Sequence, residues 1–293
     1  MEDARHDAVL FVLIAFALDW TLWIAAGIAS GGRIEGALWS ALLPLSMYGP
    51  LLAALVLLKT GRVKVGRGWR LKLRGHVLLY LAALLLPTLL AAAGAAVYFC
   101  FVPGDFDTTL SSFAAAAEEQ LGAGPSQIPA LFAAQVASSA LLAPFLNALF
   151  AIGEEAGWRG YLYPVLKRLL PARGAALATG AIWGIWHAPL IAMGYNYGRS
   201  YSGFPFVGIL AMVLFCAAFG VFLSWLRDRS ESVWPSALAH GALNATAGIG
   251  IWFSRGGQGI LGPAPLGLLA VIPTLVLAAV LLRGMSGAAE PES

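Results

Sequence analysis

HVLLYLAALLLPTLLAAAGAAVYFCFV, the sequence of residues 76–102, contains no Asp, Glu, Lys or Arg. A helix that crosses a bilayer needs about 20 predominantly apolar residues, so this stretch predicts a transmembrane helix. Seven further apolar runs of similar length occur along the 293-residue chain, at 8–29, 37–58, 128–152, 174–194, 204–226, 232–254 and 264–283. We therefore predict an all-α fold, a polytopic transmembrane helical bundle of about eight spans.

The composition of the whole chain supports a membrane protein. Hydrophobic residues make up 59% of it and charged residues 11%, whereas about 25% of the residues of a soluble domain are charged. The formal net charge of +3 is too small to indicate binding to nucleic acid. Membrane lipid is the partner that this composition implies.

Charged residues in the loops predict the orientation of the chain. The loop at 59–74 holds seven Lys and Arg residues, whereas the loop at 103–127 holds Asp and Glu but no Lys or Arg. By the positive-inside rule the first loop is cytoplasmic and the second is external. With eight spans, this choice places fifteen of the eighteen basic residues on the cytoplasmic side. We predict that both termini are cytoplasmic and, from the Ala-, Gly- and Arg-rich composition, that the membrane is a bacterial cytoplasmic membrane.

The chain is expected to form one integral-membrane domain over residues 1–283, with its motif-bearing core at about 128–254 and a disordered tail at 284–293. The fourth span is unusually long. Residues 128–168 would form a helix of about 60 Å, twice the thickness of the hydrocarbon core. We expect this helix either to be broken, with Pro144 as the candidate kink, or to project beyond the membrane.

Ionisable side chains within apolar stretches are costly in a bilayer and therefore indicate function. Glu154, His187 and His240 lie 13, 14 and 11 residues from the nearest basic residue at the cytoplasmic end of their segments. These separations correspond to depths of about 16–21 Å, so three spans place a polar group at a similar level. Asp19, in the first span, is interpreted as a structural hydrogen-bond partner, with a role in a substrate groove as the alternative.

The local spacings divide these residues into roles. In the segment GEEAGWRGYL at 153–162, Glu155 and Arg159 lie four residues apart on one helical face and can form an ion pair. Glu154 lies on a different face of the helix from Glu155 and Arg159, so it is left free to act as a general base. The segment HGALN at 240–244 likewise places His240 and Asn244 on one face.

These side chains allow two forms of hydrolysis. In the first, Glu154 takes a proton from water with help from His187, while His240 and Asn244 donate hydrogen bonds to the developing oxyanion. In the second, Glu154, His187 and His240 hold a zinc ion whose bound water is the nucleophile. The spacing of the residues favours neither form over the other.

The three segments resemble the motifs of the CAAX prenyl-protease and bacteriocin-processing family of intramembrane proteases. The resemblance rests on Glu-Glu-x-x-x-Arg at 154–159, aromatic-x-x-x-His at 183–187 and His-x-x-x-Asn at 240–244, in this order. It implies that Glu154 is the general base and that His187, His240 and Asn244 complete the site. The second motif usually begins with Phe, and we expect the Trp at position 183 to leave the chemistry unchanged.

The leading hypothesis is therefore an intramembrane endopeptidase, entered by its substrate from the cytoplasmic side or laterally. The substrate would be a peptide or membrane protein, and for a CAAX protein the enzyme would remove a C-terminal tripeptide after a prenylated Cys. Two alternatives remain open. One is a proton-coupled membrane transporter, and the other is a catalytically silent immunity or scaffold protein.

Overall fold

The computed structural model describes residues 2–59, 68–256 and 259–285, and these residues are helical over most of their length. Part of the basic loop, at 60–67, and residues 286–293 of the tail predicted to be disordered lie outside the described residues. The helices are α1 (Glu2–Ala29), α2 (Ala37–Ser46), α3 (Gly49–Leu58), α4 (Val77–Phe101), η1 (Pro103–Asp105), α5 (Ser111–Leu121), η2 (Pro125–Gln127), α6 (Ile128–Leu141), α7 (Ala143–Gly157), η3 (Trp158–Leu162), α8 (Tyr163–Lys167), α9 (Ala172–Trp186), α10 (Ala188–Ala192), α11 (Phe206–Ser230), α12 (Trp234–Thr246), α13 (Ile249–Trp252) and α14 (Ile272–Arg283). The all-α fold is thus confirmed for the described part of the chain.

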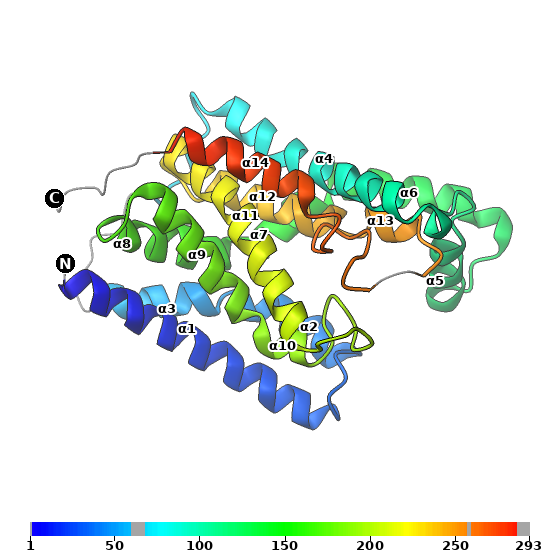
Figure 1. Cartoon of the computed structure of the whole chain (residues 1–293), viewed down its shortest axis with the longest axis horizontal. Coiled ribbons are helices and arrows are strands. Elements are labelled where there is room, and N and C mark those ends of the chain that lie inside the picture. Colours follow the sequence, from blue (N-terminus) through cyan, green and yellow to red (C-terminus); the bar gives the residue numbers. More distant parts are fainter. Residues whose placement is uncertain (1, 60–67, 257–258, 286–293) are drawn as a thin grey trace.

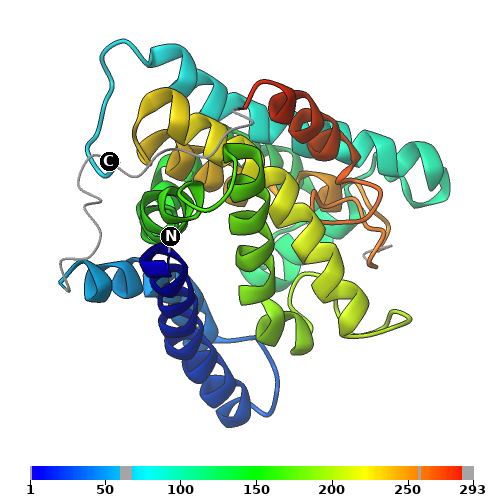
Figure 2. The same cartoon turned by 60° about the vertical axis from the view of Figure 1, so that its left-hand side comes forward.

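The helices form an elongated bundle in which α1, α4 and α14 lie closer to the long axis and α9 and α11 cross it obliquely (Figure 1). The start of α1, the short helix α8 and the end of α14 lie at one end of the bundle, and α5 and α13 lie at the other. Turned by 60°, the same bundle shows α1 beside α2 and α3, on the opposite side from α4 and α14 (Figure 2). Between these two sides α7 packs against α3 and α12, and α9 packs against α11.

The predicted count of eight spans is not confirmed. Four helices of the described chain are long and apolar enough to cross a membrane: 2–29, 37–58, 77–101 and 206–230. A bent pair, 125–141 with 143–167, raises the number to five if the pair is one span. The three other predicted spans correspond to shorter helices. The helix α9 has 15 residues, α12 has 13 and α14 has 12.

The predicted break in the fourth span is confirmed. The helices α6 and α7 meet at an angle of 47° across Leu142. Pro144 follows directly in the first turn of α7, where the missing N–H of a proline costs nothing. After the break the chain stays helical to Lys167, and Trp158–Leu162 form one π-helical turn. Such turns are rare and often lie at functional sites.

Small residues allow the helices around α7 and α9 to approach closely. A Cβ atom at Gly157 would lie 2.4 Å from Cβ of Pro50, so α3 packs directly on the backbone of α7. A Cβ atom at Gly184 would lie 2.5 Å from the Cα atom of Val213 in α11. Each glycine has a second glycine four residues before it, a spacing common where membrane helices pack together. This packing brings the motif-bearing helices α7, α9 and α12 around a shared interior.

Candidate active site

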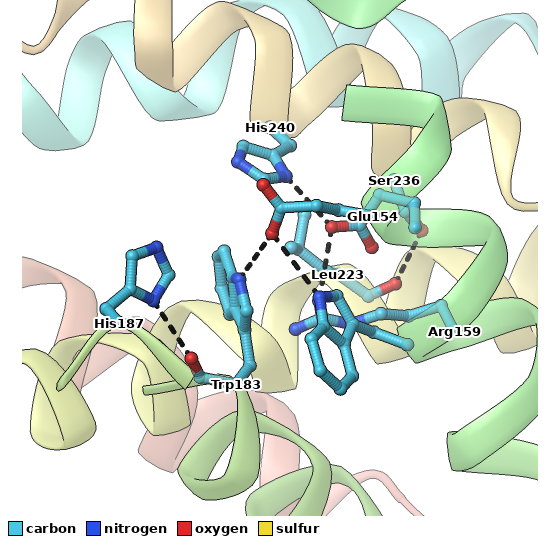
Figure 3. A network of polar contacts seen from close by, with 9 residues as sticks. Glu154, Arg159, Trp183, His187, Leu223, Ser236 and His240 are labelled. Atoms are coloured by element: carbon cyan, nitrogen blue, oxygen red, sulfur yellow. Dashed lines mark hydrogen bonds and ion pairs between the residues drawn. The ribbon is translucent and has the colours of Figure 1, made fainter. Parts of the chain in front are cut away.

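Glu154 lies near the end of α7 and is 3% exposed. Two indole N–H groups donate hydrogen bonds to it, from Trp183 at 2.6 Å and from Trp158 at 3.3 Å. Both bonds end on Oε2, so among the described residues Oε1 is the oxygen left for a ligand. Figure 3 shows the carboxylate between the imidazole of His240 and the indole of Trp183. One carboxylate oxygen is therefore held in place while the other can react.

Glu155 connects α7 to two other parts of the site. Its Oε1 atom accepts a hydrogen bond from Nη1 of Arg159 at 3.1 Å, which confirms the ion pair expected from the sequence. The same oxygen lies 3.0 Å from Nδ1 of His240 in α12. Arg159 is fully buried, and its guanidinium lies 4.7 Å from the centre of the Trp183 ring. Glu155 therefore orients His240 in addition to balancing the charge of Arg159.

His187 lies at a break between two helices. The helix α9 ends at Trp186 and α10 begins at Ala188. Pro189 has no N–H to continue the hydrogen-bonding pattern of α9, which explains why the helix stops here. Nδ1 of His187 lies 2.9 Å from the carbonyl oxygen of Trp183. The break lets the imidazole project into the interior of the bundle.

These hydrogen bonds determine which nitrogen of each histidine carries the proton. A carbonyl or carboxylate oxygen can only accept, so Nδ1 of both His187 and His240 must donate. In the neutral ring the remaining Nε2 atom is then an acceptor. His187 can thus accept a hydrogen bond from a water molecule. His240 can donate from Nε2 only when its ring carries a proton on both nitrogens.

All four residues predicted to be catalytic line one cavity of about 400 Å³. These residues are Glu154, His187, His240 and Asn244. Asn244 lies one helical turn beyond His240. Its side chain is exposed and lines the cavity. The remaining wall is mostly apolar, with Trp23, Phe215 and Leu243 among its residues. Few polar groups in an apolar cavity are the usual composition of a substrate site.

The described residues include no group of three or more His, Cys, Asp or Glu side chains arranged to hold a metal ion. Glu154, His187 and His240 thus do not come together as a set of three metal ligands in this arrangement. Nδ1 of each histidine donates to a protein oxygen, as it also does in many metal-binding imidazoles, so Nε2 of each ring is the nitrogen left for a ligand. The zinc-bound form of hydrolysis stays a prediction.

The region that holds this site is similar to a known family. Residues 130–246 match the family model described as type II CAAX prenyl endopeptidase Rce1-like. Glu154, Arg159, His187, His240 and Asn244 all fall within the matched region. The resemblance to the CAAX protease family is confirmed.

A curated protein from Methanococcus maripaludis is similar to part of this chain. The protein named CAAX prenyl protease 2 from Methanococcus maripaludis is 30% identical over 91 residues. The matched stretch spans 30% of this chain and 34% of that relative. The likeness is therefore confined to about a third of either protein.

At Trp183 the structure shows a contact that the sequence did not predict. The indole N–H of Trp183 makes the shorter of the two hydrogen bonds to Glu154. A phenylalanine at this position has no donor and could not make this bond. The expectation that the tryptophan leaves the chemistry unchanged stays a prediction. The bond from Glu155 to His240 was also missed. Residues 85 positions apart give no sequence signal for such a contact.

Asp19 lies outside the cavity lining. It is buried in α1 and accepts a hydrogen bond from Nε1 of Trp186 at 3.0 Å. Nε1 of the neighbouring Trp20 donates to the carbonyl oxygen of Trp186 at 2.8 Å. Asp19 thus acts as the structural hydrogen-bond partner predicted from the sequence, and it fastens α1 to the end of α9.

Proposed function

We propose that this chain is an intramembrane endopeptidase that hydrolyses a peptide bond in a membrane-embedded or lipid-modified substrate. This proposal rests on one observation: the side chains of Glu154, His187, His240 and Asn244 line the same cavity. They come from α7, from α12 and from the junction of α9 and α10, and a carboxylate with one restrained oxygen lies among them. The match to the Rce1-like family supports a membrane protease.

In the proposed reaction, Glu154 acts as the general base through Oε1 and takes a proton from a water molecule. Nε2 of His187 accepts the second hydrogen of this water and so orients its oxygen towards the scissile carbonyl. A C–O bond forms as the carbonyl becomes a tetrahedral oxyanion. The amide group of Asn244 donates to this oxyanion, and His240 adds a second donor when doubly protonated. The C–N bond then breaks as Glu154 returns its proton to the departing amine.

A CAAX-type substrate gives the first test of this proposal. The purified protein in detergent micelles, where both faces are accessible, is incubated with a peptide that ends in a prenylated Cys and three further residues. Release of the C-terminal tripeptide is measured by mass spectrometry. Because general-base catalysis contributes about 10²–10⁴-fold, Glu154→Gln should lower the turnover rate by about this factor.

The matched control is Glu118→Gln, which removes an exposed carboxylate from α5. It should retain wild-type turnover. Equal turnover by the wild type and Glu154→Gln would contradict the role of Glu154. The assay is repeated after metal chelation, and we expect activity to persist. Loss of activity that added zinc restores would require a metal-bound step instead.

A further inference from the structure

A second cavity, of about 490 Å³, lies between α8, the end of α11 and the end of α14. It belongs to the end of the bundle at which α8 and the end of α14 lie in Figure 1. Three basic side chains line it, those of Lys167, Arg227 and Arg229, together with the aromatic rings of Tyr163 and Trp225. Its described lining residues differ from those of the candidate active site, so the proposed hydrolysis does not account for it.

This second cavity lies at the level of a membrane surface. The helix α11 is long and apolar enough to cross a bilayer, and it has 25 residues. Its length of about 37 Å exceeds the hydrocarbon thickness of about 30 Å, so its last turn reaches the headgroup layer. Trp225 and the lining residues at 227–231 lie at this end of α11. Tryptophan and tyrosine are enriched at the same level in membrane proteins.

The acidic side chains in the wall are already held by protein partners. Asp228 accepts a hydrogen bond from the hydroxyl of Tyr163 at 2.6 Å, and its other oxygen lies 3.1 Å from Nζ of Lys167. Glu231 accepts from Nζ of Lys72 at 2.5 Å. These contacts balance both carboxylates, so an incoming anion does not face an uncompensated negative charge.

Two arginines then supply the positive charge of the cavity. The guanidinium of Arg229 lies 5.6 Å from the centre of the Trp225 ring. The guanidinium of Arg227 packs against Gly68, where a Cβ atom would lie 2.6 Å from Nη2. These contacts hold both side chains at the cavity wall. Guanidinium groups match the geometry of phosphate oxygens and bind them with paired hydrogen bonds.

An apolar surface leads from the cavity along α14. Val276 and Val280 are 59% and 57% exposed. Gly284, four residues further on, is part of the cavity wall. Residues four apart lie on one face of a helix, so acyl chains can lie against the two valines while their headgroup occupies the cavity. This surface favours a lipid over a free phosphate ion.

We propose that the cavity between α8, α11 and α14 binds the phosphate-bearing headgroup of an anionic phospholipid. Basic pockets between membrane helices recognise such headgroups. The bound lipid joins the ends of three helices. One of them, α8, directly follows the π-helical turn at the end of α7. A ligand that binds only the folded state raises its stability, so the lipid stabilises this end of the bundle.

Lipid binding to the purified, delipidated full chain in a neutral detergent tests this site. Native mass spectrometry measures the affinity for phosphatidylglycerol, and tryptophan fluorescence measures the unfolding midpoint with and without the lipid. The test variant combines Arg227→Gln with Arg229→Gln. The matched control combines Arg173→Gln with Arg283→Gln, which removes the same charge from exposed positions at the ends of α9 and α14 that do not line the cavity.

The test variant should bind phosphatidylglycerol about 25-fold more weakly, since each basic residue near an anionic headgroup contributes about fivefold in affinity. The lipid should raise the unfolding midpoint of the wild type and of the control, but not that of the test variant. If the double variant does not fold, Arg229→Gln alone should lose about fivefold, with Arg283→Gln as its control.

Three results would overturn the proposal. Equal affinities of the test variant and the control would show that the lipid responds only to overall charge. Equal affinity of the wild type for phosphatidylcholine would show that an anionic headgroup is not required. Displacement of the lipid by inorganic phosphate would assign the cavity to a free phosphate ion. All of these measurements are independent of hydrolysis, so failure here is distinct from failure of the proposed protease activity.

Discussion

At the scale of single residues, the site depends on partners that orient its reactive groups. Trp183 is the clearest example, because its indole donates to Glu154 while its carbonyl oxygen accepts from His187. Its ring also lies 5.1 Å from the centre of the His240 ring. Trp183 is thus in contact with three of the four proposed catalytic residues and is a positioning residue for them.

Trp183→Phe should lower kcat with little change in KM. The substitution keeps an aromatic ring next to Arg159 but removes the N–H that restrains Oε2 of Glu154. A hydrogen bond to a charged group contributes about 1.5–3 kcal/mol, which corresponds to a loss of about tenfold or more in kcat. Steady-state kinetics on a cleaved peptide measures the effect.

Trp158→Phe is the matched comparison, because it removes a donor to the same oxygen at the longer distance of 3.3 Å. Its effect on kcat should be smaller. If Trp183→Phe raised KM alone, or left kcat at the wild-type value, Trp183 would be a packing residue and not a positioning residue.

The sequence predicted the catalytic candidates because ionisable residues stand out in an apolar background. It predicted the ion pair between Glu155 and Arg159 because their spacing is local. It could not predict that Glu155 also holds His240, or that Trp183 donates to Glu154. Both contacts join different helices, and helix periodicity carries no information about which residues meet across an interface.

At the scale of helices, close packing at glycine fixes the position of α7. The space beside Gly157 is filled by Pro50, whose Cβ and backbone carbon lie 2.4 and 2.5 Å from a Cβ built on the glycine. An alanine there must push α3 away from α7. Since α7 carries Glu154, a shift of the helix would also disturb the site.

We predict that Gly157→Ala lowers the thermal unfolding midpoint in detergent, because overpacking costs about 1–3 kcal/mol. Gly174→Ala in α9 is the control. Its new Cβ atom would lie 3.7 Å from the nearest atom, an ordinary contact distance. This control should unfold at the wild-type temperature or slightly above, since alanine favours a helix by about 1 kcal/mol. A Gly157→Ala variant as stable as the wild type would contradict this packing.

Asp107 holds the segment before α5 in place. It accepts hydrogen bonds from Ser111 and Thr109 at the start of this helix. The N–H of Asp107 donates to the carbonyl oxygen of Phe253 at 2.8 Å, which joins the segment to the end of α13. The bonds from Ser111 and then Thr109 lower the pKa of Asp107 below its usual range.

This lowered pKa predicts a loss of stability in acid. The folded state favours the ionised carboxylate, so the contribution is present above the unfolded pKa of about 4 and is lost as the pH falls below it. The unfolding midpoint of the wild type should therefore drop more between pH 6 and pH 3 than that of Asp107→Asn. Tryptophan fluorescence measures both midpoints, and equal drops would show that Asp107 does not contribute.

At the scale of the whole molecule, the sequence predicted the helical class and the clustering of the motifs, whereas the predicted count of eight spans is not confirmed. Apolar length does not reveal where a helix is interrupted. The predicted span 174–194 is divided at His187, and the span 232–254 is divided between α12 and α13. Such breaks are tolerated where neighbouring helices shield the backbone from lipid. The break before Pro144 was predictable because the segment was too long for one straight span.

The central claim, that Glu154 makes this chain a protease, is tested most directly in its own membrane. Three strains are compared, with the wild-type protein, Glu154→Gln or Glu118→Gln at equal abundance, and mass spectrometry identifies the peptide termini in each membrane fraction. Termini that occur with the wild type and with Glu118→Gln but not with Glu154→Gln are the predicted result and would name the substrate. Identical sets of termini in the wild-type and Glu154→Gln membranes would contradict the proposed function.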